Sequence, residues 1–388
     1  MSGSDHLSKA FAGFILGAVG MFAVMYSTQA ILPELSDDFD ISPSRAGLSV
    51  SFLIVAVALG GFAWGPLSDR IGRPRAIRLA SLLIVPPTVA VALAPSFDVL
   101  LACRILQGLC MPGLLAVGAP YVYEVFVPRM GSRAMGYYVS ALVLGGLIGR
   151  LGVGLATAAV GWRIAIGALA ILPLLAAFVM RKGLPEPAGL PARAGGLGRH
   201  LRNGRLLGVA FGGGALFFVF VGTFTYISYR LVKPPFSYSG GVTSLVFALW
   251  LVGLTGPVMG RLADRIGWQR LALAATGLAT IGILLTLPDV LPLVVVGLAC
   301  IAAAMFAGFT ASQLGIGEVA PSDRGAATAL FYAIYYMSGA LGAYLPGRAW
   351  EEWGWTGVAV SSLAMLVVAS IILGAVGRTG TMAVARSL

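Results

Sequence analysis

The sequence predicts an all-α membrane protein with twelve transmembrane helices in two pseudo-symmetric six-helix bundles. Its composition, its apolar stretches and an internal repeat carry this prediction. Of the 388 residues, 58% are hydrophobic and only 11% are charged, whereas a soluble domain carries about 25% charged residues. A soluble fold of this size could not bury so much apolar surface and still present a charged face to water. The bilayer is therefore the expected solvent.

Twelve predominantly apolar stretches are close to the roughly 20 residues that a membrane-spanning helix needs. Their apolar runs are continuous and lack the two-residue alternation of a membrane β-barrel. In chain order they are residues 10–32, 46–65, 76–95, 98–123, 134–160, 163–181, 206–230, 241–260, 271–288, 291–317, 326–349 and 356–376.

The distribution of basic residues predicts the orientation of these segments. With the N-terminus in the cytoplasm, nineteen of the 26 lysines and arginines fall in cytoplasmic segments. Five fall in outer segments, namely Arg45, Arg163, Arg230, Lys233 and Arg348. This split follows the positive-inside rule, so both termini are expected in the cytoplasm. The net charge of +11 is therefore explained by the orientation of the chain in the membrane, and we expect no nucleic-acid partner.

An internal repeat divides the chain into halves. Residues Gly65–Arg75 read GPLSDRIGRPR, residues Gly260–Arg270 read GRLADRIGWQR, and seven of the eleven positions are identical. Glu124 and Glu318 form a second matching pair at almost the same offset. A repeat of this kind indicates a duplicated unit. We predict an N-terminal bundle over 1–181, a cytoplasmic linker over 182–205 and a C-terminal bundle over 206–388.

These motifs resemble those of a known transporter family. The loop Gly65–Arg75 resembles motif A of the major facilitator superfamily, and Gly260–Arg270 resembles its second copy. Arg104–Gly108 (RILQG) resembles the fourth-helix motif, and Gly145–Gly154 resembles the glycine-rich fifth-helix motif of the antiporters. The chain looks most like the bacterial twelve-helix drug–proton antiporter branch, typified by sugar- and drug-efflux permeases. It departs from that branch at Arg150, where antiporters usually carry proline.

The resemblance implies a gating role for charged residues at the cytoplasmic ends of the helices. Asp69, with Arg70 and Arg73, would latch the second helix to the eleventh in the outward-facing state, with Glu124 as a partner for the loop arginines. The alternative is that these charges only set topology and cap helices. The full predicted gating set is Gly65, Asp69, Arg70, Gly72, Arg73, Glu124, Asp264, Arg265 and Glu318.

Arg104 and Arg150 are the two basic residues well inside predicted helices. Because a charge near mid-membrane costs about 2.5–3.5 kcal/mol on insertion scales, such residues are functional candidates. For Arg104, bonding to neighbouring backbone and contact with substrate are both open. For Arg150 we expect a role in the transport cavity.

The family resemblance places the transport cavity along helices one, four, seven and ten, with contributions from two, five, eight and eleven. An aromatic lining with few charges suits amphipathic or lipophilic organic substrates. Each aromatic taken singly is also compatible with helix packing or interfacial anchoring. The predicted cavity residues are Tyr26, Gln29, Arg104, Arg150, Phe224, Tyr226, Trp250, Phe309, Gln313, Tyr332 and Tyr335.

Proton coupling needs a group that gains and loses a proton as access to the cavity changes. No carboxylate falls near the middle of any predicted helix. The remaining carboxylates are Glu34, at the outer end of the first helix, and Glu124 and Glu318 at cytoplasmic ends, and burial could raise the pKa of any of them. Glu34 is the coupling candidate. The alternative is that Glu34 lies in a solvated outer loop with Asp37, Asp38 and Asp40.

The sequence therefore predicts a monomeric secondary transporter in the inner (cytoplasmic) membrane of a bacterium. It would export a small amphipathic drug or metabolite in exchange for protons, by alternating access and without a cofactor or metal. The alternative is a facilitator or importer of an organic anion that uses Arg104 and Arg150. An enzyme is not expected, because there is no soluble domain, Walker loop or Ser/His/Asp set.

Overall fold

The computed structural model describes residues 3–131, 133–187, 200–320 and 324–385, and within these residues every regular element is a helix. The chain forms two compact units. Unit 1 comprises Met1–Ile41, Leu48–Ala192 and Tyr238–Ala248, and unit 2 comprises Ser42–Gly47, Arg193–Ser237 and Leu249–Leu388. The all-α fold class is confirmed. The predicted bundle boundaries stay a prediction, and residues 188–199 of the predicted linker lie outside the described residues.

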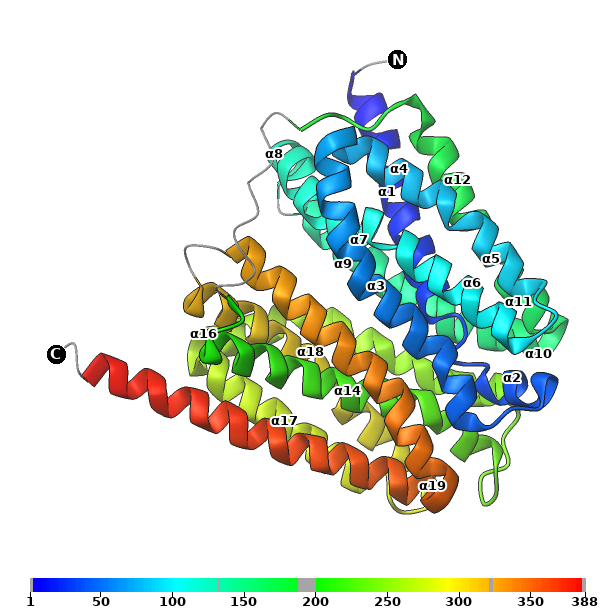
Figure 1. Ribbon diagram of the computed structural model, residues 1–388, viewed down its shortest axis with the longest axis vertical. Helices are drawn as coiled ribbons and strands as arrows, with labels where there is room; N and C mark the ends of the chain where they lie inside the picture. The colour runs from blue at the N-terminus through cyan, green and yellow to red at the C-terminus, as the bar shows by residue number, and fades with distance from the viewer. Residues whose placement is uncertain (1–2, 132, 188–199, 321–323, 386–388) are drawn as a thin grey trace. The chain divides into compact units, whose positions relative to one another are not determined.

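The helices of unit 1 come mainly from the first half of the chain (Figure 1). They are α1 (Gly3–Tyr26), α2 (Leu32–Phe39), most of α3 (Pro43–Ile71), α4 (Arg73–Leu83), α5 (Val85–Ala92), α6 (Phe97–Cys110), α7 (Pro112–Tyr121), the π-helix Val122–Phe126, α8 (Val127–Met130), α9 (Arg133–Leu147), the π-helix Ile148–Gly152, α10 (Val153–Val160), α11 (Trp162–Ala168), α12 (Ile171–Val179), the 3₁₀ turn Met180–Lys182 and α15 (Gly240–Thr243).

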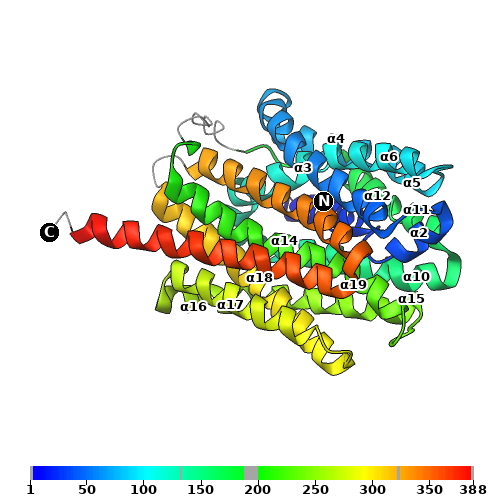
Figure 2. The same cartoon turned by 60° about the horizontal axis from the view of Figure 1, so that its bottom comes forward.

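The helices of unit 2 are fewer and longer. They are α14 (Gly204–Val232), the 3₁₀ segment Ser244–Thr255, whose first residues belong to unit 1, α16 (Gly256–Ile266), α17 (Trp268–Leu285), α18 (Leu291–Val319) and α19 (Arg324–Ala385). The element α19 is two helices joined at Gly354, whose φ of 56° breaks the helical path. Figure 1 shows its orange and red arms folding back on each other, and Figure 2 shows the same arms from a second side.

The number of membrane spans follows from these elements. Ten described helices are long and apolar enough to cross a membrane, and a bent pair, Gly240–Thr255 with Val258–Ile266, makes an eleventh. The longest of the ten, Ala326–Val376, contains the break at Gly354 and therefore corresponds to the two last predicted segments. The described residues thus contain counterparts of all twelve predicted spans.

The first span ends earlier than predicted. We expected it to run to residue 32, but α1 ends at Tyr26 and a separate short helix, α2, begins at Leu32. Ser27 Oγ donates to the carbonyl of Val24 at 3.0 Å, a local bond that competes with helix continuation. Pro33 then occupies the first turn of α2, a position that proline favours. Glu34 consequently lies on α2.

The helix α14 forms the centre of unit 2, where it packs against α18 and α19. Its glycines make this close packing possible. A side chain at Gly213 would collide with Ser312 of α18, and one at Gly214 would collide with Ser338 of α19. Small residues at such contacts allow helix backbones to approach closely where lipid supplies no hydrophobic drive.

Candidate functional site

The first copy of the repeated loop positions an ion pair in unit 1. Gly72 has a φ of 88°, a conformation that favours glycine, and it lets the chain reverse between α3 and α4. Arg73 is the first residue of α4, and its Nη1 lies 2.5 Å from Oε1 of Glu124. The Arg73 side chain is 14% exposed and that of Glu124 is 37% exposed. The structure thus brings together the two residues that the family resemblance pairs.

The second copy of the loop has the same backbone plan in unit 2 with a different donor. Gly267, with a φ of 84°, precedes α17, and Trp268 is the first residue of that helix. The indole Nε1 of Trp268 donates to Oε2 of Glu318 at 2.8 Å. Trp268 therefore replaces the arginine while the carboxylate partner keeps its place.

The other members of the predicted gating set lie near these pairs in sequence but not in contact. Asp69 and Arg70 close α3, and Asp264 and Arg265 close α16, all four exposed to solvent. None of the four makes an ion pair with a described residue of its own unit. Gly65 lies in the last two turns of α3 and is half-buried. Their role as a latch stays a prediction.

Arg104 is a fully buried hydrogen-bonding centre of unit 1. Its Nε donates to the carbonyl of Ser49 at 2.9 Å. Its Nη1 donates to the carbonyl of Val24 at 2.9 Å and its Nη2 to that of Met25 at 2.8 Å. Nη1 also donates to Oε1 of Gln107 at 2.9 Å. These bonds agree with the first of the two predicted roles of Arg104, which is bonding to neighbouring backbone.

Arg150 lies in a π-helix against α1, and π-helical turns occur often at functional sites. Its Nε donates to Oε1 of Gln29 at 2.6 Å, and its Cζ lies 3.5 Å from the centre of the Tyr26 ring. Gly149, the preceding residue, lies so close to the carbonyl of Ala23 that a side chain there would collide with it. The close packing of the π-helix on α1 therefore places a buried cation on an aromatic face.

Aromatic side chains form a cluster inside unit 2, which we call the aromatic cluster. Phe217 of α14 stacks on Tyr335 of α19 at 4.1 Å between ring centres. Phe309 of α18 lies 5.5 Å from Tyr335. Gln313 donates through Nε2 to the hydroxyl of Tyr332 at 3.1 Å. Four predicted cavity residues thus meet at one place, and their polar groups are one amide and the hydroxyls of Tyr332 and Tyr335.

Three further predicted cavity residues of unit 2 lie elsewhere. Phe224 stacks on Phe220 at 4.5 Å between ring centres, and Phe220 lies tilted against Trp250 at 5.6 Å, so these three rings form a second group. Tyr226 is fully buried and donates to the carbonyl of Ala343 at 2.6 Å. That bond joins α14 to α19.

Glu34 is half-buried in unit 1, on α2. Its Oε1 faces Gly240 of α15 so closely that a side chain at Gly240 would collide with it. Its Oε2 is buried and has no hydrogen-bond partner among the described residues. Burial raises the pKa of the Glu34 carboxyl above its ordinary value, and the nearby Asp37 adds to this effect. The structure does not place Glu34 in a solvated loop.

Sequence reasoning missed two residues that complete these sites. Phe217, at the centre of the aromatic cluster, shares one face of α14 with Phe220 and Phe224, because residues three and seven apart lie on the same side of a helix. Gln107 bonds Arg104 and donates to Oγ1 of Thr88 at 3.0 Å. Gln107 lies three residues after Arg104, a spacing that places both side chains on one face of a helix, and this spacing could have indicated the contact. Within the described residues, no group of three His, Cys, Asp or Glu could hold a metal ion.

Comparison with known proteins identifies relatives of the whole chain. The family described as Major Facilitator Superfamily matches residues 14–232 and 209–380. The chain is 32% identical over 378 residues to the inner membrane transport protein YnfM of Escherichia coli K12, which covers 95% of this chain and 91% of that protein. It is 27% identical over 385 residues to the uncharacterized MFS-type transporter YybF of Bacillus subtilis 168, covering 97% and 95% of the two chains.

Solved structures share the fold at low sequence identity. A bacterial homologue of the human lysosomal transporter Spinster, in an inward-facing and occupied conformation, matches with a TM-score of 0.79 and 16% identity, covering 96% of this chain and 97% of that one. A D-xylose–proton symporter matches with a TM-score of 0.74 and 17% identity, covering 95% and 97%. These similarities concern the fold alone.

Proposed function

The chain belongs to the Major Facilitator Superfamily, and we propose that it exports amphipathic organic compounds in exchange for protons across a bacterial cytoplasmic membrane. The family match and the transporter relatives of the whole chain show that the protein is a multi-pass membrane transporter and not an enzyme. The proposal adds the substrate class, the coupling ion and the drug–proton antiporter branch.

The observation that carries proton coupling is the environment of Glu34. A half-buried carboxyl with one oxygen lacking a partner among the described residues is more stable in its neutral form. It takes up a proton at a higher pH than a solvated carboxyl does. Any movement that hydrates Glu34 lowers its pKa and releases the proton. A carboxyl that changes between these environments can couple proton transfer to a conformational change.

The substrate class is supported by the aromatic cluster. Phe217, Phe309 and Tyr335 supply aromatic rings, while Gln313 and Tyr332 supply an amide and a hydroxyl. Such a surface binds apolar and cationic groups through ring faces and orients them through few hydrogen bonds. An amphipathic compound has both features.

The paired residues at the cytoplasmic loops support alternating access. Arg73 with Glu124 in unit 1, and Trp268 with Glu318 in unit 2, each join the start of one helix to a carboxylate of another. Side-chain bonds of this kind can hold in one conformation and open in the other. Their free-energy difference between the two conformations sets which one dominates.

A second candidate function is facilitated transport of an organic anion. The observation that favours it is Arg150, a buried guanidinium held by Gln29 and the Tyr26 ring. A guanidinium can bind a carboxylate through two parallel hydrogen bonds. Arg104 supports this function less, because backbone carbonyls already accept its donors.

The experiment uses inside-out membrane vesicles with an acidic lumen, reported by a pH-sensitive dye. Lipophilic cations, neutral drugs and organic anions are added one at a time. We expect a cation or a neutral drug to dissipate the gradient with the wild type. We expect Glu34→Gln to abolish this response while it retains exchange of labelled compound against unlabelled compound. Asp40→Asn, at an exposed carboxylate at the end of the same helix, is the matched control and should respond like the wild type.

Two outcomes would overturn the proposal. A normal proton response in Glu34→Gln would remove Glu34 from coupling. Failure of every compound to move protons, with a labelled organic anion equilibrating through the wild type but not through Arg150→Ala, would establish the facilitator instead.

A further inference from the structure

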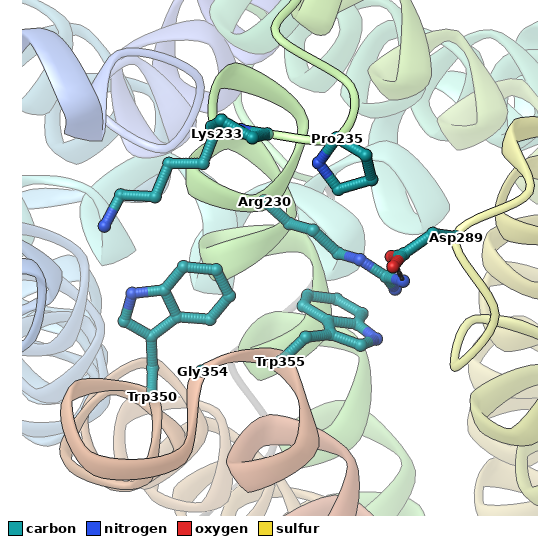
Figure 3. Close-up of a pocket in the computed structure, with 8 residues that line it drawn as sticks. Arg230, Lys233, Pro235, Asp289, Trp350, Gly354 and Trp355 are labelled. Atoms are coloured by element: carbon teal, nitrogen blue, oxygen red, sulfur yellow. Dashed lines mark hydrogen bonds and ion pairs between the residues drawn. The ribbon is translucent and has the colours of Figure 1, made fainter.

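We propose that unit 2 carries a binding site for the phosphate group of a membrane phospholipid, separate from the aromatic cluster. The site is a pocket of about 290 Å³ lined by Arg230, Lys233, Pro234, Pro235, Asp289, Trp350, Gly354 and Trp355. Figure 3 shows Lys233 on the side of Trp350, and Arg230 pointing to Asp289 on the side of Trp355.

Arg230 gives the pocket a rigid cationic wall. Its side chain is 6% exposed, and it donates to the carbonyls of Thr286, Leu287 and Pro288 in the turn between α17 and α18. It also donates to Oδ1 of Asp289 at 2.9 Å. The indole of Trp355 donates to Oγ1 of Thr286 at 3.0 Å. These bonds hold the end of α14, the turn and the start of the second arm of α19 in one arrangement.

The charges of the pocket select an anion. Asp289 pairs with Arg230, so these two charges largely compensate each other. Lys233 is exposed, makes no ion pair with a described residue of unit 2, and lies with its Nζ 5.8 Å from the centre of the Trp350 ring. The pocket therefore has one uncompensated positive charge, which matches the single negative charge of a phosphodiester. Lysine is a common phosphate ligand in proteins.

The position of the pocket indicates that the phosphate belongs to a lipid. It lies where α14 ends at Val232, α17 ends at Leu285, α18 begins at Leu291 and α19 breaks at Gly354. Helix ends meet the water at the level of the lipid headgroups, where tryptophan is enriched. By the predicted orientation this is the outer leaflet.

The surroundings of the pocket are apolar and exposed, as contact with acyl chains requires. Val290 is 47% exposed and Trp353 is 63% exposed, and each is next to a lining residue in sequence. Leu287, two residues before Asp289, is 40% exposed. A water-soluble phosphate would gain nothing from these side chains, whereas a phospholipid would bury them. An organic cation would be repelled by Lys233, which separates this site from the proposed transport substrates.

The test measures quenching of tryptophan fluorescence in the full-length protein in detergent. The quencher is phosphatidylglycerol brominated high in its acyl chains, and the variant is Lys233→Gln at an exposed position. We expect the variant to require about fivefold more brominated lipid for half-maximal quenching, as loss of one interfacial basic contact predicts. Trp350→Phe should remove part of the saturable quenching, which identifies the fluorophore. Arg348→Gln removes an exposed basic residue outside the pocket and should titrate like the wild type.

Three outcomes would overturn the site. The first is equal titration of the wild type and Lys233→Gln. The second is an equal shift in Arg348→Gln, which would indicate general surface attraction. The third is reversal of quenching by millimolar inorganic phosphate, which would indicate a site for soluble phosphate. No transport is measured, so the result is independent of the proposed function.

Discussion

The two repeated loops hold the same geometry with different chemistry. In unit 1 a glycine turn is followed by Arg73, which pairs with Glu124. In unit 2 an equivalent turn is followed by Trp268, which donates a hydrogen bond to Glu318. An ion pair changes in strength with charge and salt, whereas an indole donor needs only an oxygen acceptor. Duplication has thus kept the position of the contact while its electrostatic character has diverged.

The same contrast extends to the interior of the two units. Unit 1 buries Arg104 and Arg150 among carbonyls, amides and a tyrosine ring. Unit 2 buries one such cation among its described residues, Arg230, and has the aromatic cluster, in which Phe217 and Tyr335 stack. Buried cations depend on complete sets of hydrogen bonds, while stacked rings tolerate small changes of shape. Unit 1 should therefore be the more sensitive unit to single substitutions of polar residues.

The largest expected effect is that of Arg104→Ala. It removes the guanidinium that donates to the carbonyls of Ser49, Val24 and Met25, and it should destabilise unit 1 by about 3–5 kcal/mol. The matched change in unit 2, Phe217→Leu, should cost about 1–2 kcal/mol. Thermal unfolding of both variants in detergent measures the difference. Equal losses of thermal stability would contradict the contrast between the units.

Charge reversal tests the ion pair of the first loop. Arg73→Glu places two carboxylates at the contact with Glu124, and it should lower the transport rate about tenfold through loss of attraction and added repulsion. Adding Glu124→Arg should restore most of the rate. If the double variant stays as slow as the single variant, the pair does not act through its attraction.

The pH dependence of stability tests the buried carboxyl of unit 1. Because burial raises the pKa of Glu34 above its ordinary value of 4.5, the neutral form is favoured in the folded protein. Its contribution to stability is complete below the ordinary value and is lost as the pH rises through the raised value. The Tm of the wild type should therefore fall relative to that of Glu34→Gln as the pH rises from acidic to neutral. Parallel pH profiles would show that Glu34 is solvated.

The smallest effects distinguish the two loops most sharply. Glu124→Gln removes a charge from an ion pair, and it should slow transport about threefold. Glu318→Gln keeps an amide oxygen that accepts from the Trp268 indole equally well, so transport should change less than about twofold. Transport rates in vesicles at low and high salt measure both. A larger effect at Glu318 would mean that its charge matters.

The fold was predictable because the bilayer imposes simple requirements. Continuous apolar runs predicted the spans, and the match between Gly65–Arg75 and Gly260–Arg270 predicted the duplication. The end of the first span was missed, since a local bond of Ser27 and a proline at position 33 outweigh the apolar pattern there. Consequently the setting of Glu34, on a separate helix against Gly240, could not be read from its neighbours in sequence.

The candidate sites were predictable as residue types and not as contacts. The charge of Arg104 within an apolar run indicated that it needs partners, but its acceptors come from residues about 55 and 80 positions away in the chain. Phe217 was missed, because a ring on an apolar helix acquires its role only from the partner it stacks on. In the sequence, Arg230 was only one of the basic residues counted for the membrane orientation. Its pocket could not be predicted, because the pocket is formed by helix ends that are far apart in the chain.

By itself, the sequence determined the membrane class, the helical spans and the duplicated halves, since these follow from local hydrophobicity and from identity between distant segments. Only the tertiary structure decided which buried polar groups find partners. It engaged Arg104 with backbone carbonyls, left one oxygen of Glu34 without a partner among the described residues, and gave Glu318 an indole donor. The reason is physical: hydrophobic burial is non-directional and can be summed along the chain, whereas a hydrogen bond depends on the positions of two atoms that folding brings together.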